Sequence, residues 1–66
     1  MAIYIIFVAG IGADGVQKNS IYTLGYTTYE MAEKEVPTAI DYFHAANPTI
    51  TSEVIGRVFE VEVKIA

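Results

Sequence analysis

The sequence predicts an α+β fold, a two-layer ββαβ arrangement with one helix packed on one face of a three-stranded antiparallel sheet of order 2-1-3. Three observations predict it. Two β-rich segments come first, one segment with helical periodicity follows, and a segment of strict apolar–polar alternation comes last. A chain of 66 residues has room for one small domain, over 1–66, and not for two.

The first predicted strand is the most apolar segment of the chain. Ile3 to Val8 carries β-branched and aromatic residues at both odd and even positions, which is typical of a central strand. A glycine-rich loop over 10–19 is long enough to reverse the chain. The second predicted strand, Ser20 to Tyr26, is weakened by Gly25.

The predicted helix begins after the second strand. Thr27 and Glu30 have the spacing of a capping box, with Thr27 as the N-cap. Pro37 interrupts the helix, but the apolar stripe continues in phase across it. This favours one helix that is kinked at Pro37, with Pro37 on the solvent side, and that ends at Asn47-Pro48. Two short helices meeting at Pro37 are the alternative. The residues of the stripe are Tyr29, Ala32, Val36, Ala39, Ile40 and Phe43.

The last predicted strand, Val54 to Ile65, sets the order of the sheet. If the first two strands form a hairpin, the helix returns the chain so that the last strand pairs with the first and runs antiparallel to it. The order 2-1-3 then places the most apolar strand in the centre.

One helix can cover only one face of this sheet. If Phe59, Val61, Val63 and Ile65 face the helix, the other face includes Glu60, Glu62 and Lys64. That other face also receives half of the first strand, and both halves are apolar. Because this face is apolar whichever half it receives, an association partner must cover it. We expect Tyr22 and Tyr26 of the second strand to lie on the same face. The two possible halves are Ile3, Ile5 and Phe7, or Tyr4, Ile6 and Val8.

The composition limits the possible functions. The chain has no cysteine and a single histidine, which excludes a disulfide, a thiolate metal site and a multi-histidine centre within one chain. Its net charge of −4 argues against direct binding to nucleic acid or to an anionic membrane. No secretory signal or membrane-spanning segment is visible, so we expect a cytoplasmic location, or the host cytoplasm if the gene is viral. A hydrophobic content of 53% favours a homo-oligomer, most simply a dimer.

One string has the spacing of a dinucleotide-binding turn. Gly10, Gly12 and Gly15 follow the first strand as G-x-G-x-x-G. The residues after them show no helical stripe, and the acidic residues about 20 positions further on lie inside the predicted helix. A hairpin loop, with positive φ at Gly12 and Gly15, is the better interpretation. An anion-binding nest of backbone N–H groups at these three glycines remains an alternative.

Two groups of polar residues on the helix are further candidates. His44 lies three residues after Asp41, but a histidine in the last turn is favoured by the helix dipole alone, so we predict no catalytic residue. Glu30, Glu33, Glu35 and Asp41 form an acidic cluster, and carboxylates spaced along one exposed helix can imitate the spacing of nucleic-acid phosphates. A solvated helix face explains the same residues without a partner.

These observations favour a small acidic, non-catalytic interaction module without metal or cofactor. We expect it to modulate a macromolecular partner, either a basic protein or a nucleic-acid enzyme that it inhibits. The outline resembles small accessory proteins of phages and mobile elements, but the likeness rests on element order alone and implies no residue roles. The predicted partner-binding residues are Tyr4, Ile6, Tyr22, Tyr26, Glu30, Glu33 and Asp41.

Two other functions fit the sequence. One is a minimal enzyme or small-ligand-binding protein whose site forms between subunits around the loop over 10–15. The other is a structural oligomer that uses the apolar sheet face to build a larger assembly.

Overall fold

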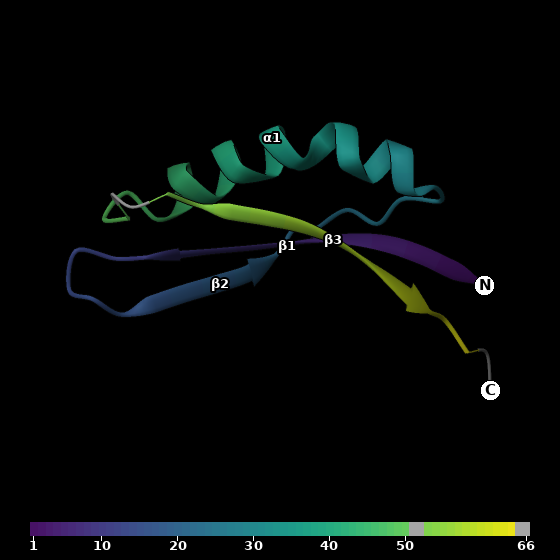
Figure 1. Ribbon diagram of the computed structural model, residues 1–66, viewed down its shortest axis with the longest axis horizontal. Coiled ribbons are helices and arrows are strands. Elements are labelled where there is room, and N and C mark those ends of the chain that lie inside the picture. The colour runs from purple at the N-terminus through teal and green to yellow at the C-terminus, as the bar shows by residue number, and fades with distance from the viewer. Residues whose placement is uncertain (51–52, 65–66) are drawn as a thin grey trace.

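The computed structural model describes residues 1–50 and 53–64 and confirms the predicted fold class. Figure 1 shows its four elements: β1 (Ala2–Ile11), β2 (Gln17–Ile21), α1 (Tyr29–Ala46) and β3 (Ile55–Glu62). The sheet has the order β2-β1-β3, and both neighbouring pairs are antiparallel. The helix lies on one side of the sheet and packs on β1 and β3.

β1 supplies the centre of the sheet, as its composition predicts. Its even-numbered residues face α1, and Ile6 and Val8 are buried there. Its odd-numbered residues face the other way and are half-buried from Ile3 to Ala9. The central strand is therefore apolar on both faces, although only one face is covered by the helix.

β2 begins earlier and ends earlier than the sequence predicts. It pairs with β1 from Gln17 to Ile21, so the loop between the two strands is shorter than the predicted loop over 10–19. Beyond it only Tyr22 and Tyr26 remain bonded to β1, since the Tyr22 N–H donates to the Ile6 carbonyl at 2.8 Å and Tyr26 forms an isolated bridge with Tyr4. The intervening chain, which includes Gly25, leaves the ladder.

α1 begins one residue later than predicted. Thr28, not Thr27, is the N-cap, and its Oγ1 accepts a hydrogen bond from the Met31 N–H at 3.2 Å. Tyr26 is held in its bridge with Tyr4 by two hydrogen bonds, so Thr27 is needed to carry the chain out of the sheet. The helix continues unbroken through Pro37, which lies on its exposed side, and ends at the C-cap Asn47.

The orientation of β3 is opposite to the one considered from the sequence. Phe59 and Val61 pair with Ile5 and Ile3 and therefore lie on the uncovered side, while Val58 faces the helix. Val63 lies beyond the end of β3, and Ile65 lies outside the described residues.

Two glycines on the covered side explain this orientation. A Cβ added to Gly56 would lie 2.8 Å from Val36 Cγ1, and one added to Gly10 would lie 3.0 Å from Ile50 Cγ2. The chain above the sheet approaches these backbones so closely that no side chain fits. The covered face is therefore the one that carries Gly10 and Gly56. The buried core on that side consists of Ile6, Val8, Ala32, Ala39, Phe43, Ile50 and Val54.

Candidate interaction surfaces

The largest candidate surface is the face of the sheet that α1 leaves bare, called here the uncovered face. The strand registers bring together side chains from all three strands on this face. Its centre is apolar, and the polar residues lie toward the two edges, which is the distribution found in protein interfaces. The residues of the uncovered face are Ile3, Ile5, Phe7, Ala9, Ile11, Gln17, Asn19, Ile21, Ile55, Arg57, Phe59 and Val61.

Several large apolar side chains of this face are open to solvent. Ile55 is 55% exposed, Ile21 is 55% exposed and Phe59 is 48% exposed. Phe59 packs edge-on against Phe7, with ring centroids 6.1 Å apart, so the two rings form a fixed aromatic centre. An apolar patch that extends across three strands differs from scattered exposed residues and is a feature typical of interaction surfaces.

The predicted sheet-face residues lie on the opposite side. Ile6 is 0% exposed beneath α1, and Tyr4, Tyr22 and Tyr26 pack against the core on the same side. The helix covers the even-numbered half of β1, so of the two halves left open by the sequence the one with Tyr4 and Ile6 is not on the open face. The expectation that Tyr22 and Tyr26 join that face is wrong. Their proposed role in partner binding would need a different surface.

Tyrosine side chains join the sheet to the helix instead. Tyr4 packs edge-on against Tyr29 at a centroid distance of 6.2 Å, and Tyr22 packs in the same way against Tyr42 at 5.8 Å. The Tyr26 hydroxyl is buried without a hydrogen-bond partner. Burial raises the pKa of Tyr26 above 10.0, and the nearby Glu35 carboxylate and Tyr22 add to this shift.

The glycine-rich segment is the turn of a β-hairpin, as predicted. Gly15 has φ of +79° and is the only described residue with positive φ, so the expectation of positive φ at Gly12 is wrong. The N–H groups of Gly12 and Gly15 donate to Val16 and Gly12 carbonyls, and the Val16 N–H donates to Asp14 Oδ1. These donors are already used within the turn, and Asp14 adds a negative charge, so the contacts give an anion nest no support.

The acidic residues of the helix are exposed, as expected. Glu30, Glu33 and Asp41 all lie on the outer surface of α1. His44 is half-buried in the last turn, and within residues 1–50 and 53–64 no ion pair joins it to Asp41. The structure therefore brings no acid–base pair together at this end of the helix.

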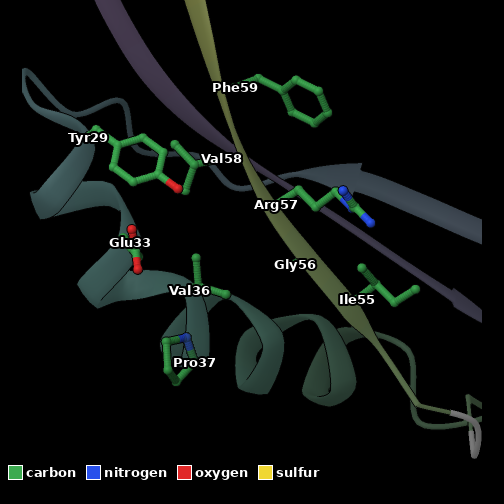
Figure 2. A pocket seen from close by; sticks show the side chains of 9 residues that line it. All are labelled: Tyr29, Glu33, Val36, Pro37, Ile55, Gly56, Arg57, Val58 and Phe59. Atoms are coloured by element: carbon green, nitrogen blue, oxygen red, sulfur yellow. The ribbon is translucent and has the colours of Figure 1, made fainter.

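A second surface, not expected from the sequence, lies where α1 passes the free edge of β3. Tyr29, Glu33, Val36 and Pro37 of the helix and residues 55–59 of the strand line an open groove of about 650 Å³, called here the edge groove (Figure 2). The Glu33 carboxylate lies on its helix side, and its charge and hydrogen bond raise the pKa of the Tyr29 hydroxyl above 10.0.

Three of the residues that sequence reasoning missed belong to β3. Ile55, Arg57 and Phe59 lie on the uncovered face, although alternation alone gave no reason to prefer this orientation. The sequence feature that could have shown this orientation is Gly56. It lies on the same side of the strand as Val58, and a glycine within a strand indicates that another segment approaches the backbone on that side.

Among residues 1–50 and 53–64, no group of three or more His, Cys, Asp or Glu side chains is arranged to hold a metal ion. No helix in the same ranges is long and apolar enough to cross a membrane. Comparison of the chain with models of protein families, with curated proteins and with solved structures gives no match.

Proposed function

We propose that this protein is a small non-catalytic interaction module that forms a homodimer through the uncovered face and presents its helix surface to a second macromolecule. The observation that carries the dimer is the exposed apolar surface centred on Phe7 and Phe59. In a two-fold symmetric dimer, the same patch on both copies is buried at once.

The size of the molecule fits this proposal. A stable interface needs about 800 Å² from each partner. This is about one sixth of the accessible surface of one copy, which is 4723 Å², and the uncovered face spans the whole three-stranded sheet. Burial of this face also adds the apolar contacts that a domain of this length lacks on its own.

The acidic helix surface supports the second half of the proposal. Glu30, Glu33 and Asp41 are exposed on the side of the sheet opposite the proposed dimer contact, so dimerisation leaves them accessible. A basic protein surface, such as that of an enzyme which acts on nucleic acid, has the complementary charge. Competition for the nucleic-acid site of that enzyme would make the module an inhibitor.

The dimer is tested with a matched pair of variants and light scattering after size exclusion. Phe59 and Tyr42 are both exposed aromatic residues, and each packs edge-on against one other ring, with Phe59 on the sheet and Tyr42 on the helix. We expect a mass near twice 7.2 kDa for the unchanged protein. Phe59→Thr should weaken the dimer at least about tenfold, whereas Tyr42→Thr should leave it unchanged. A monomer at all micromolar concentrations contradicts the proposal.

A further inference from the structure

We propose that the edge groove binds an extended segment of another protein as an additional strand beside β3, and that this segment carries a basic residue next to an acidic one. The groove shares Ile55, Arg57 and Phe59 with the uncovered face, but the added strand would pair along the edge of β3 and does not require the proposed dimer. Three observations carry it: the free backbone groups of β3, the shape of the groove, and the charges on its two sides.

The free backbone groups follow from the alternation of hydrogen bonds along β3. The Val63 N–H donates to the Met1 carbonyl at 2.7 Å, so odd-numbered residues direct their backbone groups toward β1. Gly56, Val58 and Glu60 therefore direct theirs away from the sheet. An edge of this kind, without proline or a bulge within Ile55–Glu62, is a template for a further strand.

The groove lies along this same edge. Val58 forms part of its floor, and Tyr29 and Val36 of α1 form part of its wall (Figure 2). An added strand would turn every second side chain toward this wall and the others toward the uncovered face. Its apolar residues on the helix side would contact Val36 and Val58.

The charges on the two sides of the groove define the chemistry of the segment. Glu33 lies on the helix side, and Arg57 lies on the strand and belongs to the uncovered face. Neither forms an ion pair with another residue in the described ranges 1–50 and 53–64. Because neighbouring residues of a strand point to opposite sides, a Lys or Arg facing Glu33 places the next residue beside Arg57, where Asp or Glu is complementary.

A second copy of this chain fits the groove less well. Antiparallel pairing of β3 with itself would place another α1, and with it another Glu33, over the same groove. Two carboxylates near one two-fold axis repel each other, and a chain with a net charge of −4 is complementary to a basic segment.

The test uses a blocked synthetic peptide of about eight residues, a usual strand length, in which Val and Thr alternate around a central Lys followed by Glu. Binding is measured by calorimetry at low salt for four proteins: the unchanged protein and the variants Val58→Pro, Asn19→Pro and Glu33→Lys. Val58→Pro removes an N–H that faces the groove, while Asn19→Pro removes one that faces outward at the other edge of the sheet, since Tyr22 directs its N–H toward β1. Circular dichroism checks that both variants fold.

The expected result is binding to the unchanged protein and to Asn19→Pro, and at least about tenfold weaker binding to Val58→Pro. Glu33→Lys should weaken binding about fivefold to tenfold and should restore it for a second peptide in which Glu replaces Lys. The proposal is overturned if the peptide does not bind, if the two proline variants behave alike, or if Glu33→Lys shows no change of preference. It is also overturned if Val58→Pro dissociates a dimer in the absence of peptide, because a second copy then occupies the groove.

Discussion

The two faces of the sheet share the central strand β1, but α1 covers only one of them. The even-numbered residues of β1, such as Ile6 and Val8, are buried beneath α1, whereas Ile5 and Phe7 remain half-buried on the uncovered face. Both sets are equally apolar, so hydrophobicity does not decide which face the helix covers. The glycines decide it, because Gly10 and Gly56 allow close approach on one side only.

The largest expected effect comes from shortening one side chain on each face. Ile6→Ala removes a side chain that is 0% exposed and should lower the free energy of unfolding by about 2–5 kcal/mol, close to the whole stability of so small a domain. Ile5→Ala should lower it by roughly 1 kcal/mol at low protein concentration. Urea denaturation measures both.

The concentration dependence sharpens this comparison. If the uncovered face is buried in a dimer, the loss caused by Ile5→Ala should grow as the protein concentration rises, whereas the loss caused by Ile6→Ala is already complete in the single copy. Equal losses for both variants at every concentration would show that the two faces do not differ in coverage.

The second prediction tests the role of the glycine beneath the helix. Gly56→Ala places a Cβ 2.8 Å from Val36 Cγ1, so the helix must shift, at an expected loss of about 1–3 kcal/mol. Gly25→Ala is the matched control, since its nearest neighbour would be Ile3 Cδ1 at 3.6 Å, an ordinary contact. Thermal unfolding of the two variants decides the point, and a stable Gly56→Ala protein would remove our explanation for the covered face.

Much of the fold could be predicted from the sequence because each element has a local cause. The composition of 3–8 predicts a central strand, and the helical stripe that includes Ala39 and Phe43 predicts the packed side of α1. The sheet order follows from these two facts and from the reversal of the chain at the hairpin.

The candidate surfaces could not be predicted with the same success, because they depend on which alternate residues of β3 face the helix. This strand alternates between apolar and mostly polar residues, but β1 is apolar on both faces, so the alternation does not say which face α1 covers. A shift of one residue exchanges the two faces, and only contact with α1 decides between them. The edge groove is still harder to predict from the sequence, since it depends on where α1 lies relative to β3.

The third prediction compares two adjacent threonines at the start of the helix. Thr28→Ala removes the hydroxyl that caps the Met31 N–H and should lower the free energy of unfolding by about 1 kcal/mol. Thr27→Ala should have a smaller effect, because the Thr27 hydroxyl donates only a weak hydrogen bond to Met31 Sδ at 3.7 Å. Urea denaturation of both variants tests the assignment, and a larger loss for Thr27→Ala would move the helix start back to the predicted residue.

The smallest expected effect concerns the pKa values of two tyrosines, Tyr26 and Tyr29, which are raised for different reasons. The pKa of Tyr26 is raised mainly by burial, and that of Tyr29 mainly by the charge of Glu33. Both folded-state pKa values exceed 10.0, so the folded protein binds these protons more tightly than the unfolded chain. The resulting stability is complete below pH 10.0 and is lost as the pH rises through the folded-state values.

Glu33→Gln removes the charge in the edge groove, so it should lower the pKa of Tyr29 and leave that of Tyr26 unchanged. Tyr26→Phe should leave stability at neutral pH unchanged or slightly higher, because the lost hydroxyl has no hydrogen-bond partner, and it should reduce the alkaline loss. Carbon NMR of labelled tyrosine follows each titration separately. An unchanged Tyr29 pKa in Glu33→Gln would mean that this carboxylate does not act on the groove, and would weaken the case for a basic residue beside it.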